Sequence, residues 1–407
     1  MRVLQINTVY KNGGSTGRIV YDLANCIKGN GDESYVGFGY EYEKTEDDNT
    51  FKMESILKLK LSILKTRLFA KHGFYNKNGT KRLIKWINEI RPDLIHLHNL
   101  HNHYINIEIL FNYIKKNNIP VVWTLHDCWP FTGWCAYFDY VECEKWKTGC
   151  HHCPNKHEYP YTWFFDRSKS NYKDKKRVFQ GVKNLTIVTP SRWLSKLVAQ
   201  SFLNEYPLKV INNGIDLHQF KPINSSFQNE YNIKNKYIIL AVAMNSSKRK
   251  GFHYLIKLAN ELDNDFRIVI VGLTKKRIES LPNNIIGIER TNSVSELVKI
   301  YNSADVFVNP TLEDNFPTTN IEAIACGTPV VTFKTGGSPE SIDSRTGLVI
   351  KKGDLIGLSK AIKKIAENNC NVDWESQCRR KAEMLYNKKD RYEEYIKLYY
   401  TIIKSSN

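Results

Sequence analysis

Short apolar runs alternate with helix-length amphipathic stretches along almost the whole chain. The first half has a helical pattern at 14–29 and strand-like runs at 3–7, 35–38, 94–98, 121–125, 185–188 and 209–211. The second half has helical patterns at 251–262, 294–302, 319–325 and 355–367, and strand-like runs at 237–243, 267–271, 306–309 and 330–333. Strands that are apolar throughout are typical of parallel sheets covered by helices on both faces. The pattern therefore predicts an α/β protein built on mostly parallel sheets.

The alternation is interrupted at residues 216–231, which lose their periodicity and gather polar and turn-forming residues. A chain of 407 residues is long enough for two or three domains of ordinary size. We therefore expect two α/β domains, the first over residues 1–217 and the second over 218–389. Residues 390–407 are expected to form a final helix.

Composition narrows the classes of function. Apolar residues make up 42% of the chain and charged residues 25%, which excludes a disordered or collagen-like protein. The formal net charge is +17, and residues 51–92 alone carry eleven basic but only two acidic side chains. Such an excess indicates an anionic partner, namely a phosphorylated ligand, a membrane surface or a nucleic acid. A solvated basic face is the alternative interpretation.

Residues 57–71, LKLKLSILKTRLFAK, mix apolar and basic side chains. A helix of this content suits an anionic membrane surface, and a packed helix with a basic edge is the alternative. The start of the chain lacks the pattern of a targeting signal, and the longest apolar run, 237–244, is far too short to span a bilayer. We expect a cytoplasmic protein that associates peripherally with the inner face of the plasma membrane.

Two places in the first half carry candidate chemistry. Gly13 and Gly14 separate the first strand from the first helix, where small residues let an anionic ligand approach the helix N-terminus. His126 and Asp127 follow the strand at 121–125, and ligands of open α/β sheets bind at the carboxyl ends of strands. An ordinary turn and a structural histidine are the alternatives at these two places.

The most informative stretch is NPTLEDNFPTTNIEAIACGTP at residues 309–329. A strand enters an acidic loop, and Pro317 suits the first position of the following helix. Free backbone amides in the first helical turn would form a cradle for a diphosphate. These amides belong to Thr318, Thr319 and Asn320. Asp314 and Glu322 are eight residues apart, which suits two carboxylates near opposite ends of a bound nucleotide sugar.

These motifs resemble those of the retaining glycosyltransferases of the GT-B fold, in glycosyltransferase family 4. The spacing of Asp314 and Glu322 resembles the acidic E-x7-E signature of the family, with Asp314 in place of the first Glu and Glu313 beside it. Further resemblances extend over nearly the whole chain, at residues 13–14, 124–127, 191–193, 213–216, 250–251 and 336–340. The resemblance implies two Rossmann-like, doubly wound domains facing a central cleft, with the final helix packing back on the first domain.

The resemblance also implies an activity. The chain would move a sugar from a nucleotide-diphosphate sugar, UDP- or GDP-linked, to a glycan or lipid-diphosphate-linked acceptor in cell-envelope polysaccharide synthesis. The first domain would bind the acceptor and the second the donor. Catalysis would need no metal, because a lysine and helix amides can stabilise the departing diphosphate.

Two other classes of function would account for some of these sequence features. A nucleotide-sugar epimerase or hydrolase of the same fold would use the same nucleotide cleft. A basic membrane-binding or nucleic-acid-binding protein would explain the net charge, but Glu313 and Asp314 would repel a phosphate backbone, so no nucleic-acid partner is expected.

Roles are carried over from the resemblance residue by residue. Glu322 would accept hydrogen bonds from the ribose hydroxyls, and Asp314 or Glu313 from hydroxyls of the donor sugar. Lys250 would neutralise the departing diphosphate, and His126 would contact the donor sugar near the reacting carbon. The remaining donor-binding candidates are Gly14, Arg249, Asn315, Phe316, Pro317, Thr318, Thr319 and Asn320, and the acceptor-side candidates are Gly13 and Asp127.

One position departs from the family pattern. The family usually has an arginine five positions before the lysine, and this chain has Asn245 there. Lys248 or Arg249 is therefore a candidate for the missing cation.

Residues 128–173 form a long aperiodic stretch with four tryptophans and five cysteines. Cys135, Cys143, Cys150 and Cys153 have the spacing C-x7-C-x6-C-x2-C, and C-x2-C is a common half-site for tetrahedral zinc. A cytosolic setting disfavours two disulfides. We therefore expect a structural zinc ion, with reduced thiols in a Trp-rich loop as the alternative. Substitute ligands are available at Cys128, His151 and His152.

Overall fold

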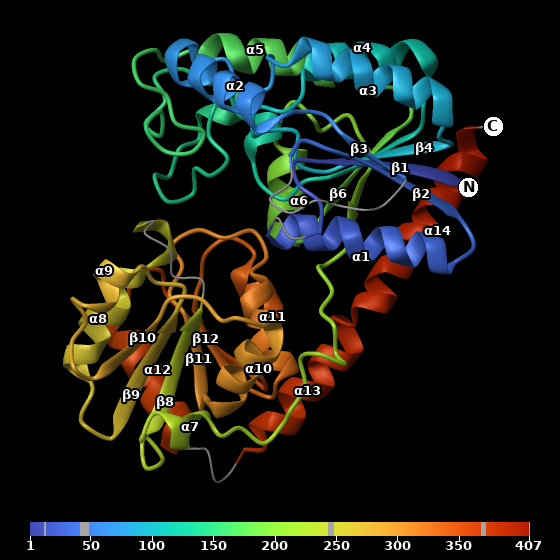
Figure 1. The fold of residues 1–407 in the computed structure, drawn as a ribbon. Coiled ribbons are helices and arrows are strands. Elements are labelled where there is room, and N and C mark those ends of the chain that lie inside the picture. The colour runs from blue at the N-terminus through green and yellow to red at the C-terminus, as the bar shows by residue number, and fades with distance from the viewer. Residues whose placement is uncertain (12–13, 41–48, 243–247, 368–371, 407) are drawn as a thin grey trace. The chain divides into compact units, whose positions relative to one another are not determined.

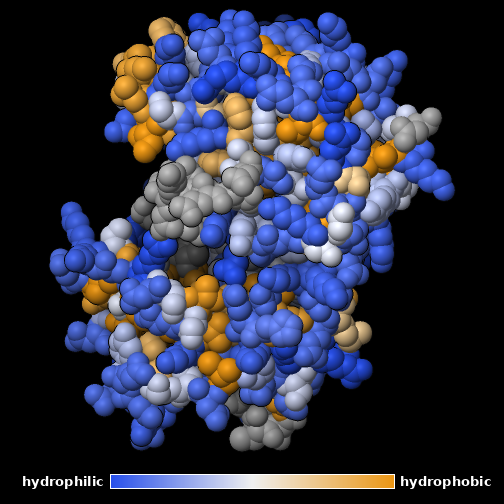
Figure 2. All heavy atoms as spheres, turned by 45° about the vertical axis from the view of Figure 1, so that its right-hand side comes forward, coloured by the Kyte–Doolittle hydropathy of each residue, from blue (hydrophilic) through white to orange (hydrophobic). Residues whose placement is uncertain are grey.

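The computed structural model describes residues 1–11, 14–40, 49–242, 248–367 and 372–406. It divides into two compact units (Figure 1). The first unit comprises Met1–Ile211 with Tyr392–Asn407, and the second comprises Asn212–Arg391. Hydrophilic residues cover most of the face seen in Figure 2, and hydrophobic residues gather at a few places on it.

The first boundary lies at residue 211 rather than at the expected 217, and contacts within the second unit explain the difference. The backbone of Ile215 donates to Tyr386 O and accepts from Lys388 N, at 2.7 and 3.0 Å. The Nζ of Lys388 also lies 2.7 Å from the Oδ2 of Asp216. The turn at residues 212–216 is therefore part of the second unit.

The first unit is built on a seven-stranded parallel sheet in the order β3-β2-β1-β4-β5-β6-β7. Its strands are β1 (Arg2–Asn7), β2 (Glu33–Phe38), β3 (Thr50–Lys52), β4 (Leu94–Leu97), β5 (Val121–Thr124), β6 (Leu185–Thr189) and β7 (Leu208–Val210). Its helices are α1 (Ser15–Gly29), α2 (Ile56–Phe69), α3 (Lys77–Ile90), α4 (Ile107–Asn117), α5 (Ser168–Phe179) and α6 (Arg192–Ala199), with short 3-10 turns η1 (Trp129–Phe131) and η2 (Lys145–Lys147).

Helices cover both faces of this sheet (Figure 1). Val121 and Trp123 of β5 pack in the core under α3, α4 and α5, whereas Val122 packs on the opposite face against α1. Successive strand residues point to opposite faces, which is why β5 is apolar throughout. The last helix, α14 (Lys388–Ser406), joins the second face, because Tyr399 OH lies 2.6 Å from His96 Nδ1 and Tyr395 OH lies 3.1 Å from Thr124 Oγ1.

The second unit is built on a six-stranded parallel sheet in the order β10-β9-β8-β11-β12-β13. Its strands are β8 (Tyr237–Val242), β9 (Phe266–Val271), β10 (Ile285–Ile288), β11 (Val306–Asn309), β12 (Val330–Phe333) and β13 (Gly347–Ile350). Its helices are α7 (Phe227–Glu230), α8 (Phe252–Glu261), α9 (Lys275–Ile278), α10 (Val294–Ser303), α11 (Thr318–Ala325), α12 (Leu355–Glu367) and α13 (Trp374–Leu385), with 3-10 turns η3 (Lys248–Lys250) and η4 (Ser338–Ser341).

Three edge strands and one helix start differ from the sequence expectation. The strands β3, β10 and β13 are short and largely unburied, so they lack the continuous apolar run that marks the buried four-residue strands such as β11 and β12. The aperiodic stretch expected to reach residue 173 ends earlier, because α5 begins at Ser168. Among the described residues, no helix combines the length and the apolar character needed to cross a bilayer.

Candidate functional site

The candidate donor site of the second unit lies where β11 leads into α11. Its central contact is an ion pair between Lys250 and Asp314, with Nζ and Oδ2 2.6 Å apart. Both side chains are partly buried, at 21% and 16% exposure. Lys250 ends η3 and Asp314 lies in the acidic loop, so the pair joins two segments that are 64 residues apart in the sequence.

Backbone contacts hold η3 against the same loop. Arg249 donates through Nη1 to the carbonyl of Glu313, at 2.7 Å, and its own carbonyl accepts from Leu312 N, at 2.8 Å. Gly251 follows η3 with a φ of +76°, and a Cβ there would lie 1.9 Å from Pro310 O. A glycine is therefore required after Lys250 for η3 to reach the loop.

A second glycine supports the loop from the other side. Gly336 has a φ of +53°, and a Cβ on it would lie 1.8 Å from the carbonyl oxygen of Asp314. The next residue, Gly337, donates its backbone N–H to the same oxygen at 3.1 Å. The backbone of Asp314 is thus fixed by the segment that precedes η4.

The start of α11 differs in detail from the sequence expectation. Pro317 is the N-cap residue rather than the first helical residue, and α11 begins at Thr318. The backbone amide of Asn320 donates to Pro317 O at 3.2 Å, so it is not free for a ligand as expected. The reason is that the first turn of α11 closes on the proline carbonyl.

The Asn320 side chain is likewise used inside the unit. It accepts from Asn309 Nδ2 at 2.8 Å, and it donates to Ser338 Oγ and Ser341 Oγ at 3.2 and 2.9 Å. Asn320 is fully buried, so its side chain ties together β11, α11 and η4. The structure therefore gives Asn320 a positioning role, whereas the sequence suggested direct donor binding.

The second carboxylate, Glu322, lies on α11 and is held by Tyr301 of α10. The Tyr301 hydroxyl donates to Glu322 Oε2 at 2.8 Å. Burial, together with this carboxylate, raises the pKa of Tyr301 well above its usual value, so the hydroxyl keeps its proton as a donor. Glu322 itself is only partly buried.

The remaining loop candidates are mostly buried. Glu313, Asn315 and Phe316 are 1%, 5% and 4% exposed. Of the two adjacent acids, Asp314 is therefore the more accessible, and Thr318 and Thr319 are partly exposed at the helix start. Asn245, the position of the usual family arginine, lies outside the described residues.

In the first unit, His126 follows β5 and belongs to a chain of neutral hydrogen bonds. Its Nε2 lies 3.1 Å from His98 Nδ1, and His98 Nε2 lies 3.2 Å from Gln5 Oε1. The Gln5 amide group donates to Val20 O at 3.1 Å, which leaves its Oε1 as the acceptor for His98. His98 must then accept at Nδ1, so the proton of His126 sits on Nε2.

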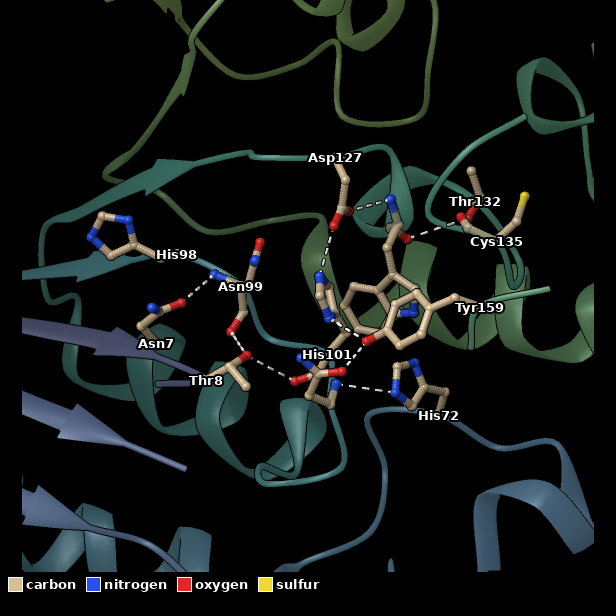
Figure 3. A network of polar contacts seen from close by, with 12 residues as sticks. Asn7, Thr8, His72, His98, Asn99, His101, Asp127, Thr132, Cys135 and Tyr159 are labelled. Atoms are coloured by element: carbon tan, nitrogen blue, oxygen red, sulfur yellow. Dashed lines mark hydrogen bonds and ion pairs between the residues drawn. The ribbon is translucent and has the colours of Figure 1, made fainter. Parts of the chain in front are cut away.

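Asp127 belongs to a second network, with His101 and Tyr159 (Figure 3). Its carboxylate lies 2.7 Å from His101 Nε2 and accepts from Trp129 N at 2.9 Å. Burial raises the pKa of Asp127, but the neighbouring His101 and these hydrogen bonds outweigh it and leave the pKa lowered. The expected acceptor-side residue is thus buried and fixes η1.

Five buried or partly buried histidines surround these networks, and we call them the histidine cluster. Burial is the main cause that lowers each pKa, to about 4 for His126 and His103, and well below the usual range for the other three. They are therefore neutral near pH 7. The cluster consists of His72, His96, His98, His103 and His126.

The glycine turn of the first unit is described only in part. Gly14 is the N-cap of α1, with a φ of +91° and open space where a Cβ would lie. Gly13 lies outside the described residues. The open approach to the α1 N-terminus is compatible with an anionic ligand.

The four candidate zinc ligands line one cavity within residues 132–154, together with Trp134 and Trp146. They are Cys135, Cys143, Cys150 and Cys153. The backbone of Gly133 donates to Cys150 Sγ at 3.1 Å. Burial raises the pKa of the Cys150 thiol to about 11. Across the described part of the chain, no group of three or more His, Cys, Asp or Glu side chains is arranged to hold a metal ion. Zinc binding therefore stays a prediction.

Sequence reasoning missed several residues that position the site. Tyr301, Gln5 and His98 carry no motif of their own. The run HLHNLHNH at 96–103 was the available signal, because several histidines after one buried strand indicate a polar network at the strand end.

The structure has two α/β units with parallel sheets, and in the second unit an acidic loop follows β11, the fourth strand. This architecture is that of the GT-B class of glycosyltransferases. The structure is similar to sucrose-phosphate synthase from Thermosynechococcus elongatus, with a TM-score of 0.73 and 16% identity over the full length of both chains. It is also similar to Anabaena Alr3699/HepE in complex with UDP, with a TM-score of 0.69 and 16% identity over 98% of this chain and all of that chain.

The family follows from the sequence. Residues 13–219 match the profile of Glycosyltransferase Family 4, and residues 236–368 match Glycosyl transferases group 1. The chain therefore belongs to glycosyltransferase family 4. It is 24% identical to the putative colanic acid biosynthesis glycosyl transferase WcaC of Escherichia coli K12, over 98% of this chain and 99% of WcaC. It is 24% identical to the capsular polysaccharide biosynthesis glycosyltransferase CapM of Staphylococcus aureus, over 52% of this chain and 60% of CapM.

Proposed function

We propose that this chain is a retaining glycosyltransferase that transfers a sugar from a nucleotide-diphosphate sugar to a glycan or lipid-diphosphate-linked acceptor. The observation that carries the proposal is the acidic loop, where Asp314 pairs with Lys250 and leads into the helix of Glu322. The donor class is supported by structures of the similar Anabaena Alr3699/HepE in complex with UDP and with UDP-glucose. We propose a UDP- or GDP-linked donor.

In this proposal the second unit binds the donor. Glu322, oriented by Tyr301, accepts hydrogen bonds from the ribose hydroxyls. Asp314 accepts hydrogen bonds from the sugar hydroxyls, since it is the more exposed acid of the loop. Lys250 lies against Asp314 and has three N–H donors, so it can also contact the diphosphate.

The reaction breaks the bond between the anomeric carbon and the diphosphate and forms a bond to the acceptor oxygen on the same face of the sugar. The diphosphate leaves with the electron pair, and the acceptor hydroxyl gives its proton to the oxygen of the departing diphosphate. Lys250, Arg249 and the free amides at the α11 N-terminus would stabilise the growing negative charge, so we propose catalysis without a metal ion. His126, oriented by its hydrogen bond to His98, would contact the donor sugar near the reacting carbon.

The pathway is proposed from the relatives. WcaC and CapM are named for colanic acid and capsular polysaccharide biosynthesis, and we propose a matching role in cell-envelope polysaccharide synthesis. A lipid-linked acceptor would place the enzyme at the inner face of the plasma membrane, as a cytoplasmic, peripherally bound protein.

The test is a transfer assay with a panel of UDP- and GDP-sugars and a lipid-linked acceptor, followed by NMR of the new anomeric carbon. Retained configuration supports the proposal, and inverted configuration refutes the retaining mechanism. Release of free sugar without an acceptor, at the same rate as with one, would instead indicate the hydrolase alternative. Full activity is expected without added Mg²⁺ or Mn²⁺, and a rate that depends on adding either ion would refute metal-independent catalysis.

A further inference from the structure

The exposed apolar side chains of the described residues are concentrated in one part of the first unit. Of eighteen large apolar side chains that are exposed, ten lie in α2 or in residues 159–165. Figure 2 shows hydrophobic residues gathered at the upper left edge, in the unit that carries α2. The ten are Ile56, Leu57, Leu61, Leu64, Phe69, Tyr159, Tyr161, Trp163, Phe164 and Phe165. Folded proteins seldom expose so many apolar groups together without a binding role.

Helix α2 supplies half of these side chains because little of it is used in the core. Leu59 and Thr66 are its only buried residues, whereas Leu57 and Ile56 are 71% and 58% exposed. A helix that faced only water would carry polar residues on this side. The exposed leucines and isoleucine therefore indicate that α2 meets something apolar.

The aromatic segment 159–165 is fixed to the end of α2. Trp163 N and Thr162 Oγ1 both donate to the carbonyl of Arg67, at 3.0 and 3.2 Å. The Arg67 guanidinium also lies 5.9 Å from the ring centres of Tyr161 and of Trp163. Residues 56–69 and 159–165 therefore form one surface, which we call the α2–aromatic surface. Phe164 and Phe165 are its most exposed aromatic side chains, at 66% and 52%.

The charge of this surface is entirely positive. Residues 56–69 and 159–165 contain no Asp or Glu, and four basic side chains of α2 are exposed. These are Lys58, Lys60, Lys65 and Arg67. Lysines next to exposed Leu, Phe and Trp suit a bilayer interface, where the rings and aliphatic groups enter the headgroup region and the ammonium groups meet anionic lipids.

We propose that the α2–aromatic surface binds anionic lipid bilayers in the plane of the membrane. A second copy of the chain fits the surface less well, because a two-fold interface would bring the same lysines face to face. Lysine is also depleted at the centres of protein interfaces. The inference deepens the peripheral membrane location proposed above and does not depend on the donor chemistry.

The test is flotation of the full chain with vesicles of phosphatidylglycerol and phosphatidylcholine, against vesicles of phosphatidylcholine alone. We expect binding only to the anionic vesicles, and release at high salt as the charges are screened. F164S/F165S is expected to lower the bound fraction about tenfold, since two phenyl rings no longer leave water. K58E/K65E is expected to abolish binding. The matched controls I356S and K360E change an exposed isoleucine and an exposed lysine of α12 and should bind like the wild type.

Two results would overturn the inference. One is equal vesicle binding by the wild type and by F164S/F165S. The other is a wild-type dimer in sedimentation that F164S/F165S converts to a monomer, without vesicle binding by either. No sugar donor is present in the assay, so its outcome is separate from that of the transfer assay. Melting temperatures of all variants should match the wild type, because the changed side chains are exposed.

Discussion

Removing the Lys250 side chain tests the proposed charge stabilisation most directly. Lys250 Nζ lies 2.6 Å from Asp314 Oδ2, and only 21% of its side chain is exposed. In a site of this kind, one charge-assisted donor contributes about 2–4 kcal/mol to the transition state. At about 1.36 kcal/mol per factor of ten, Lys250→Ala should lower kcat roughly 30- to 900-fold. Lys257→Ala is the matched control, since Lys257 lies on the following helix, α8, and is exposed.

Lys250 could also matter only because it holds Asp314, and a double-mutant cycle separates the two roles. If Lys250 only positions the carboxylate, Lys250→Ala should add nothing once Asp314→Asn has removed the charge. If Lys250 acts on the diphosphate, the double variant should be at least about tenfold slower than Asp314→Asn alone. Stability should change little, because partly exposed ion pairs contribute about 0–1 kcal/mol.

The assay is steady-state transfer with the best donor of the panel, with kcat and KM measured separately. We expect the main loss in kcat, because the charge on the diphosphate grows in the transition state. A Lys250→Ala enzyme that keeps wild-type kcat would refute the assigned role. So would equal rates for Asp314→Asn and for the double variant.

Three further predictions concern stability and the cavity. The histidine cluster stays neutral in the folded chain, so the unfolded chain binds more protons below about pH 6.5. As the pH is lowered from 6.5 to 4, the free energy of unfolding should therefore fall, by up to about 1.4 kcal/mol per pH unit for each histidine. Urea denaturation that gives the same free energy throughout this pH range would contradict the prediction. Gly336→Ala should lower both the melting temperature and donor turnover, because its Cβ would collide with Asp314 O, whereas Gly31→Ala, with similar positive φ but open space, tests the backbone strain alone. Elemental analysis of protein purified without chelator should find about one zinc per chain. The variant Cys150→Ser/Cys153→Ser should lose this zinc, whereas Cys378→Ser should keep it. Substoichiometric metal in the wild type would rule the zinc site out.

The parallel sheets and the acidic loop could be predicted because each is encoded locally. An apolar run such as Val306–Asn309 predicts a buried strand in an α/β chain, and the observed strand has the expected bounds. Edge strands such as Ile285–Ile288 were missed because four residues containing a glycine give too weak a pattern. The boundary at residue 211 was missed because it depends on the pairing of Ile215 with Asn387, which is distant in the sequence.

The residues that position the site were the hardest to predict, because their role exists only through buried long-range hydrogen bonds. Asn320 bonds to Asn309 on one side and to Ser338 and Ser341 on the other, with no charge involved. In the first unit, Gln5 and His98 likewise orient His126 through neutral groups. Such bonds do not depend on a change of protonation near pH 7, so the geometry that they fix should be the same across this range. A buried polar network is specific only when every member is satisfied, and loss of Asn320 would therefore leave several groups unpaired at once. Under the proposed function, replacing Asn320 is therefore expected to weaken donor binding even though its side chain is used inside the unit.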